Sequence, residues 1–123
     1  MARILIADDA SFMRASLKYI LENAKHDVVG MAKEGQEAID LYGRLQPDLL
    51  TLDILMEGMD GIAALREIRK KYPDAKVIMV TALGQEQFQE DARKLGAAGY
   101  IRKPFKMQEV VHELQRVLAK GEA

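Results

Sequence analysis

Residues 4–9 of the chain have the sequence ILIADD, in which four apolar residues are followed at once by two aspartates. The run lacks the alternation of polar and apolar residues that is typical of a strand with one wet face. Unbroken apolar runs of this length favour strands buried on both faces of a parallel sheet. We therefore expect residues 4–7 to form a buried strand that presents Asp8 and Asp9 at its carboxyl end.

The rest of the chain repeats this pattern. Further short apolar runs lie at residues 28–32, 49–52, 77–80 and 99–101. Apolar residues recur with helical spacing at residues 13–24, 38–45, 65–72, 88–95 and 110–118. Pro47 and Pro73 mark the ends of two of these helices, because the residue before a proline avoids the helical region. Five strands alternating with five helices predict an α/β fold: one doubly wound domain with right-handed crossovers.

The length and composition of the chain limit the kinds of protein that it can be. The 123 residues suit one domain, 1–123, and the 18 Lys and Arg nearly balance the 19 Asp and Glu. We therefore expect no nucleic-acid partner. The absence of cysteine excludes disulfides and cysteine-bound metals. Without a signal sequence or an apolar run of membrane-spanning length, we expect a cytoplasmic protein with no membrane association.

Charged and polar residues stand where the predicted strands end. In doubly wound sheets, ligands bind outside the carboxyl ends of the strands, where the strand order reverses. Asp8 and Asp9 follow the first run, Asp53 follows the third, Thr81 the fourth and Lys103 the fifth. If the first and third strands are neighbours, the three aspartates share one pocket.

These residue types indicate phosphoryl chemistry. Three adjacent carboxylates repel one another unless positive charge intervenes, and Lys103 supplies only one charge. A site without His or Cys, rich in carboxylates, favours Mg²⁺ over Zn²⁺ or Cu²⁺. A carboxylate can accept a phosphoryl group, and a metal, an ammonium and a hydroxyl suit its three oxygens. We therefore predict that Asp53 becomes phosphorylated.

The same residues resemble a known family. The residues concerned are similar to those of the receiver domain of bacterial response regulators: Asp8-Asp9, Asp53 with Met56, Met59, Asp60 and Gly61 after it, Thr81-Ala82, and Lys103-Pro104-Phe105. The resemblance covers essentially the whole chain. It implies a flavodoxin-like five-stranded parallel sheet in the order 2-1-3-4-5 with five helices.

The resemblance also implies the roles of the residues around the metal. Asp53 would be the phospho-acceptor, and Asp9 and Asp53 would bind Mg²⁺ directly. The backbone carbonyl of Leu55 would be a third ligand, and Asp8 would act through water.

Other roles concern the phosphoryl group and the response to it. Thr81 would supply a hydroxyl that moves to the phosphoryl group, Lys103 would pair with it, and the backbone amide of Ala82 would donate to it. Tyr100 would be an aromatic switch that turns inward with Thr81. The family also has a cis bond at the position of Lys103-Pro104, which the local sequence permits.

Three residues depart from the family pattern. Glu57 stands where the family usually has proline, and we interpret it as a solvated loop residue. Leu55 and Leu83 lie two residues past Asp53 and Thr81, at positions that tune dephosphorylation in the family. Because two leucines cannot orient an attacking water, we expect slow self-hydrolysis of the phospho-form.

The predicted function is that of a single-domain response regulator, which we expect to be a monomer. A histidine kinase would donate the phosphoryl group to Asp53, and the switched protein would bind an output protein. Residues 6–14, IADDASFMR, are similar to chemotaxis-type members that bind the flagellar motor switch. A phosphorelay intermediate that passes the group to a phosphotransfer protein, or a phosphate sink, fits the same site.

Rival classes fit less well. The chain is not expected to be a turnover enzyme, although it would assist its own phosphorylation and dephosphorylation. An aspartyl-nucleophile phosphatase needs a second Asp two positions after the first, where this chain has Leu55. A flavodoxin-like electron carrier needs a phosphate loop after the first strand, which is missing. A pseudo-receiver interaction module would normally have lost part of the site.

Overall fold

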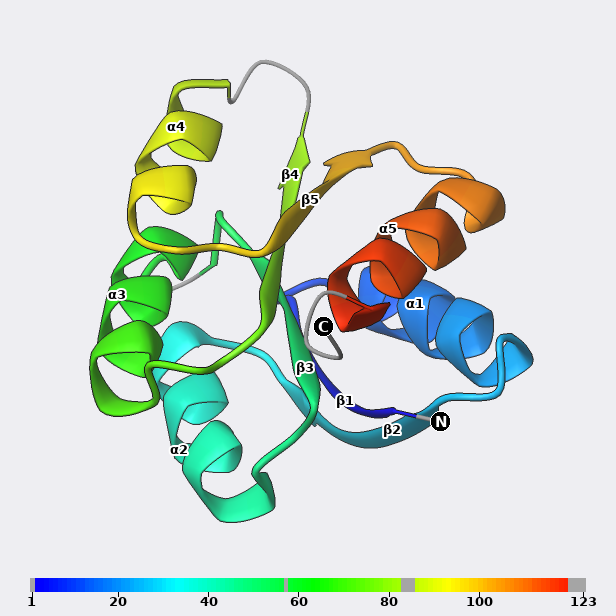
Figure 1. Ribbon diagram of the computed structural model, residues 1–123, viewed down its shortest axis with the longest axis horizontal. Helices are drawn as coiled ribbons and strands as arrows, with labels where there is room; N and C mark the ends of the chain where they lie inside the picture. Colours follow the sequence, from blue (N-terminus) through cyan, green and yellow to red (C-terminus); the bar gives the residue numbers. More distant parts are fainter. Residues whose placement is uncertain (1, 57, 83–85, 120–123) are drawn as a thin grey trace.

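The structure is a computed structural model and describes residues 2–56, 58–82 and 86–119. A central sheet lies between two layers of helices (Figure 1). Glu57 and Leu83, two of the residues that depart from the family pattern, lie outside the described residues.

The sheet has five parallel strands in the order β2-β1-β3-β4-β5, which confirms the predicted fold. The strands are β1 Arg3–Ala7, β2 Asp27–Ala32, β3 Leu49–Asp53, β4 Val77–Ala82 and β5 Gly99–Lys103. Thr81, expected at the end of the fourth strand, is the last residue but one of β4, because that strand continues to pair with β5 as far as Ala82.

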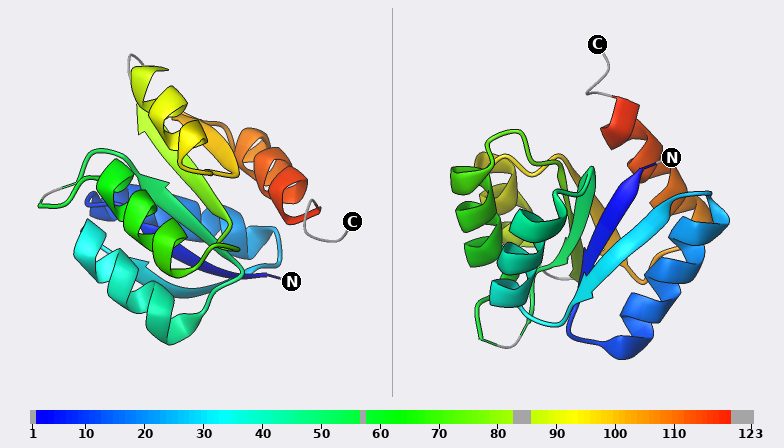
Figure 2. Two further views of the ribbon diagram at one scale, coloured as in Figure 1. Left: turned by 60° about the vertical axis from the view of Figure 1, so that its left-hand side comes forward. Right: turned by 90° about the horizontal axis from the view of Figure 1, so that it is seen from below.

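The helices divide between the two faces of the sheet. They are α1 Ser11–Asn23, α2 Gly35–Leu45, α3 Gly61–Lys71, α4 Glu86–Lys94 and α5 Met107–Ala119. Helices α1 and α5 cover one face, and α2, α3 and α4 cover the other (Figure 2).

Burial on both faces of the sheet explains why polar and apolar residues do not alternate along the strands. In β1, Leu5 belongs to the core under α2 and α3, whereas Ile4 and Ile6 belong to the core under α1 and α5. All three side chains are fully buried. Each face therefore requires an apolar residue, and the run is continuous.

Backbone geometry ends the helices close to the predicted places. The residue after α2, Gln46, adopts a left-handed conformation with φ of 47°, and Pro47 follows it. After α4, the chain turns at Gly96, whose φ of 93° favours glycine. The Lys103-Pro104 bond is cis, as the family resemblance implied.

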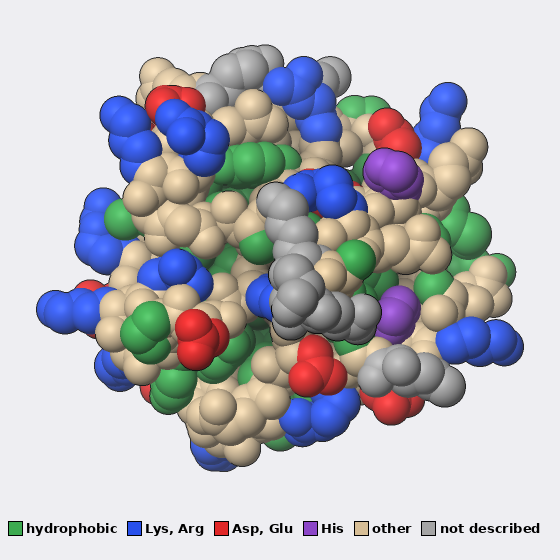
Figure 3. Space-filling view, in the orientation of Figure 1, with side chains coloured by type: hydrophobic (Ala, Val, Ile, Leu, Met, Phe, Trp, Pro, Cys, Tyr) green, Lys and Arg blue, Asp and Glu red, His purple; other side chains and the backbone are tan. Residues whose placement is uncertain are grey.

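Basic side chains gather over α3 and α4 on the face shown in Figure 3. The last turns of these helices carry Arg69, Lys70, Lys71, Arg93 and Lys94. Cations at a helix C-terminus interact favourably with its unpaired carbonyl groups, so the local fold accounts for the cluster. Among the described residues, no helix is both long and apolar enough to span a membrane.

Helix α3 begins directly beside the end of β3. Asp60 caps it by accepting a hydrogen bond from the Ala63 amide at 2.8 Å, and the Gly61 amide donates to the Ile54 carbonyl at 2.7 Å. A Cβ atom at Gly61 would overlap the Asp53 carbonyl oxygen and lie 2.7 Å from the Ile54 Cα. Glycine is therefore required for this close approach.

We predict that Gly61→Ala destabilises the protein by about 2 kcal/mol, because the new methyl group would push against backbone atoms. The matched control is Gly43→Ala in α2, where the nearest atom is the Tyr72 hydroxyl at 2.6 Å, the end of a side chain that can rotate. The control should change stability by less than about 1 kcal/mol. Urea unfolding of both variants measures the difference, and equal effects would contradict the prediction.

Candidate functional site

Three strands bring the predicted site residues to one edge of the sheet. Asp8 and Asp9 follow β1, Asp53 is the last residue of β3, and Lys103 is the last residue of β5. Because all strands are parallel, their carboxyl ends share this edge. Strand β1 lies between β2 and β3, so the chain order reverses beside it, where ligands bind in such sheets.

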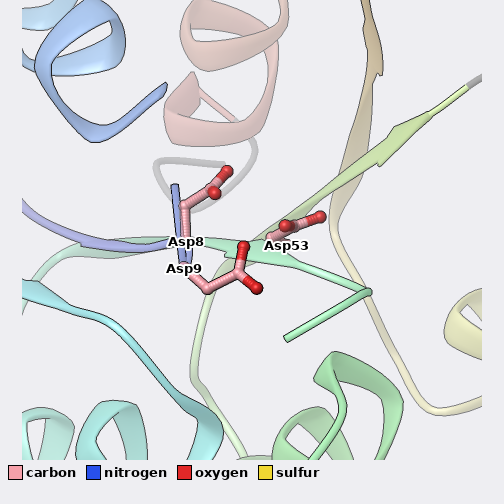
Figure 4. Close-up of side chains that lie close together, drawn as sticks. All are labelled: Asp8, Asp9 and Asp53. Atoms are coloured by element: carbon pink, nitrogen blue, oxygen red, sulfur yellow. The ribbon is translucent and has the colours of Figure 1, made fainter. Parts of the chain in front are cut away.

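The three aspartates converge at this edge (Figure 4). Each offers a carboxylate oxygen, and these oxygens lie within 4.8 Å of one another. Asp8 is 1% exposed and Asp53 is 5% exposed, whereas Asp9 faces solvent. The site therefore combines two buried carboxylates with one open side.

Lys103 lies between the two buried carboxylates. Its Nζ atom is 3.0 Å from Asp8 Oδ2 and 3.4 Å from Asp53 Oδ2. The other Asp8 oxygen accepts a hydrogen bond from the Ala10 amide at 2.9 Å. Asp8 is thus held at both oxygens, and Asp53 has the longer contact with the ammonium group.

The environment of Asp53 opposes its ionisation. Burial, and after it the charge of Asp8, raise the pKa of Asp53 from its ordinary value of 3.8 to about 6, although Lys103 acts in the opposite direction. One lysine therefore does not offset burial and carboxylate repulsion together. Additional positive charge at this edge would favour the ionised form.

The donor set fits a hard divalent cation. Three carboxylates within reach of one another supply oxygen ligands, and the exposed side at Asp9 leaves room for water molecules. Mg²⁺ typically keeps several waters and takes one or two carboxylates. Asp8, Asp9 and Asp53 are therefore the described residues that would hold such an ion.

The remaining predicted residues lie near this edge in different ways. Thr81 is 1% exposed and follows Val80, the register partner of Asp53, and Ala82 ends the same strand. The Leu55 side chain is 55% exposed. The roles of Thr81, Ala82 and the Leu55 carbonyl stay predictions.

Tyr100 is held by groups on both of its neighbouring helices. Its hydroxyl donates to the Gln89 carbonyl of α4 at 2.9 Å, and its backbone amide donates to Glu113 Oε2 of α5 at 2.8 Å. The ring is half-buried against the core under α3 and α4. Its role as a switch also stays a prediction.

Arg14 contributes to the site and was not identified from the sequence. Its Nη1 atom donates to the Asp8 carbonyl oxygen at 2.7 Å and so fixes the backbone between the two adjacent aspartates. The available signal was its position in the first turns of the helix that follows Asp9. An arginine near a helix start has many possible partners, so the sequence did not indicate this one.

Comparisons with known proteins agree with this geometry. The family described as "Response regulator receiver domain" matches residues 4–115. Protein CcdB of Bacillus subtilis is 46% identical over 118 residues, which cover 96% of this chain and 98% of that protein. Chemotaxis protein CheY of Thermotoga maritima is 46% identical over 115 residues, which cover 94% and 96%.

Solved structures show the same fold. A two-component response regulator of the LuxR family from Aurantimonas has a TM-score of 0.92 and 30% identity, covering 98% of this chain and 86% of that one. A CheX-CheY-BeF3-Mg complex from Borrelia burgdorferi has a TM-score of 0.90 and 35% identity, covering 94% and 87%.

We predict that Asp53→Asn stabilises the protein in EDTA at pH 8. The folded-state pKa of about 6 exceeds the ordinary value of 3.8, so ionisation costs stability that is regained as the pH falls through 6 toward 4. The gain should be about 1–3 kcal/mol at pH 8 and smaller at pH 5. Thermal unfolding at both pH values measures it. Exposed Asp91→Asn is the control, and a gain of equal size at both pH values would contradict the cause given.

We predict that Mg²⁺ raises the melting temperature of the wild type at pH 7.5. A ligand that binds only the folded state increases the free energy of unfolding by about 2.7 kcal/mol when its concentration is one hundred times the dissociation constant. Asp9→Asn should reduce the rise, since it removes the carboxylate on the open side of the cluster. Asp91→Asn, remote from the cluster, should keep it. An undiminished rise in Asp9→Asn would exclude Asp9 as a ligand.

Proposed function

The chain belongs to the family of response regulator receiver domains, and from this premise we propose that it is a switch controlled by phosphorylation of Asp53. A histidine kinase carrying a phosphohistidine would be the donor. The observation that carries the proposal is the buried Asp53 carboxylate, which has Asp8 and Asp9 beside it and Lys103 Nζ at 3.4 Å.

Asp53 acts as the nucleophile in this proposal. One of its carboxylate oxygens attacks the phosphorus atom in line with the leaving imidazole. An O–P bond forms, the P–N bond breaks, and its electron pair returns to the histidine nitrogen of the kinase. Bound Mg²⁺ would offset negative charge on the carboxylates and on the phosphoryl oxygens during the transfer.

The other residues position the groups that react. Arg14 fixes the backbone at Asp8, and the Ala10 amide fixes the Asp8 side chain. Lys103, whose Nζ atom is 3.4 Å from Asp53 Oδ2, is proposed to pair with a phosphoryl oxygen. The Thr81 hydroxyl and the Ala82 amide, at the end of the neighbouring strand, are proposed as further donors to that group.

The switch follows from the added charge. A phosphoryl group brings roughly two negative charges and three strong acceptor oxygens to a crowded edge. Thr81 and Lys103 would be drawn toward it. Because Lys103 and Tyr100 belong to the same strand, β5, the change would reach the surface formed by α4, β5 and α5.

We propose that the output is a change in binding to another protein, in chemotaxis or motility. Relatives named chemotaxis protein CheY, 46% identical in Thermotoga maritima and 45% identical in Listeria monocytogenes, support this pathway. The flagellar motor switch is the proposed partner. The Borrelia structure pairs a CheY with CheX, which makes a CheX-type protein a second partner to test.

The decisive experiment follows phosphorylation by mass. We expect wild-type protein with acetyl phosphate and Mg²⁺ to gain one phosphoryl group, and Asp53→Asn to gain none. Asp91→Asn, an exposed carboxylate of α4, is the matched control and should behave like the wild type. No gain by the wild type would contradict the proposal and favour a pseudo-receiver. After removal of the donor, persistence of the added mass tests the expected slow self-hydrolysis.

A further inference from the structure

Within the part of the chain that the structure describes, the outer side of β5 has no neighbouring strand, because β5 is the last strand in the sheet order. Edge strands normally leave a row of backbone groups unpaired. Here two side chains of α5 reach this edge. Glu113 Oε2 accepts a hydrogen bond from the Tyr100 amide at 2.8 Å, and Arg116 Nη2 donates to the Ala98 carbonyl at 2.9 Å.

The two contacts reproduce the pattern of a parallel strand. In a parallel sheet, one residue of a strand donates its amide to one carbonyl of the neighbour and accepts from the amide two residues further on. Ala98 and Tyr100 stand in that relation about Gly99. Arg116 therefore takes the place of the amide, and Glu113 takes the place of the carbonyl, of one residue in a sixth strand.

Glu113 and Arg116 also hold each other. Arg116 Nε lies 2.9 Å from Glu113 Oε1, and Arg116 Nη2 lies 2.8 Å from Glu113 Oε2. The hydrogen bond from Arg116 is the main reason that the pKa of Glu113 lies below its ordinary value. Charge-assisted, two-point pairs of this kind are stronger and geometrically more specific than single neutral hydrogen bonds.

Gly99 provides the space for this pair. A Cβ atom there would overlap Glu113 Oε2 and would lie 2.9 Å from Val117 Cγ2 and 3.0 Å from Arg116 Nη2. The buried glycine thus lets the two charged groups lie directly on the strand. We call Glu113, Arg116 and Gly99 the β5 clamp.

The backbone of Tyr100 is consequently held more strongly than its side chain. The clamp holds its backbone through a carboxylate that arginine fixes in place. Its side chain is half-buried against the core under α3 and α4, and its hydroxyl donates a neutral hydrogen bond to the Gln89 carbonyl of α4. The weaker attachment is on α4, so the side chain can leave while the backbone stays.

We propose that Glu113 and Arg116 are positioning residues that keep the Tyr100 backbone fixed to α5 in both states of the switch, so that the Tyr100 side chain moves about a stationary pivot. The proposal rests on the proposed function, because it takes Tyr100 as the switch residue. It makes α5 the fixed part and α4 the movable part of the surface that a partner meets.

The test compares the free protein with the protein bound to Mg²⁺ and beryllofluoride, a phosphoryl analogue. Amide hydrogen exchange reports the clamp, and NMR of labelled tyrosine rings reports the side chain. We expect the Tyr100 ring signal to shift on binding while protection of the Tyr100 amide changes by less than about threefold. A fall in protection of about tenfold or more, which corresponds to loss of one hydrogen bond, would overturn the pivot.

The same measurement separates this proposal from the acceptor role of Asp53. If beryllofluoride binds and the Tyr100 ring does not shift, the pivot is overturned and the acceptor role stands. If beryllofluoride does not bind, both are overturned. Phosphorylation by acetyl phosphate gives an independent measure of the acceptor role.

Two substitutions at Glu113 distinguish positioning from general stability. Glu113→Gln keeps an oxygen acceptor and should retain Tyr100 protection within about threefold, whereas Glu113→Ala should lose about tenfold or more. Protection of Leu50 in the buried strand β3 shows whether the whole fold is affected. Gln115→Ala, exposed on α5, is the control. Unchanged Tyr100 protection in Glu113→Ala would overturn the proposal, and the glutamine variant keeps the test valid if the alanine variant does not fold.

Discussion

The crowding of negative charge at one sheet edge is the constraint on which this protein depends. Asp8 and Asp53 are almost fully buried, and the ammonium group of Lys103 contacts both. Burial and repulsion leave the pKa of Asp53 at about 6. The ionised carboxylates of this edge therefore destabilise the folded protein, and an added positive charge would reduce that cost. The same imbalance that weakens the fold means that an added cation would stabilise this edge.

The rest of the fold holds this edge in place. Gly61 lets α3 begin against the end of β3, Arg14 fixes the backbone at Asp8, and α5 fastens β5 through Glu113. Strand β5 carries both Lys103 at the charged edge and Tyr100 at the surface. Strand β5 thus places a residue of the charged edge three positions from a residue of the surface between α4 and α5. This proximity would give the proposed switch a short physical route.

Much of the fold followed from local patterns in the sequence. The runs that became β1 and β3 were identified because burial on both faces requires continuous apolar residues, and Pro47 and Pro73 marked helix ends by restricting the residue before them. Arg14 and Glu113 were not identified as contributors. Their partners, the Asp8 carbonyl and the Tyr100 amide, are backbone groups, which every residue possesses and which no sequence pattern distinguishes.

The sequence by itself determined the kind of domain and the identity of the charged residues, since both depend on residue type and on position relative to strand ends. Only the tertiary structure decided which groups these residues contact and at what distance. Lys103 lies between Asp8 and Asp53, and Tyr100 is fixed from α5 but only lightly held by α4. Distances and burial set these energies, and both arise from packing of segments that are far apart in the chain.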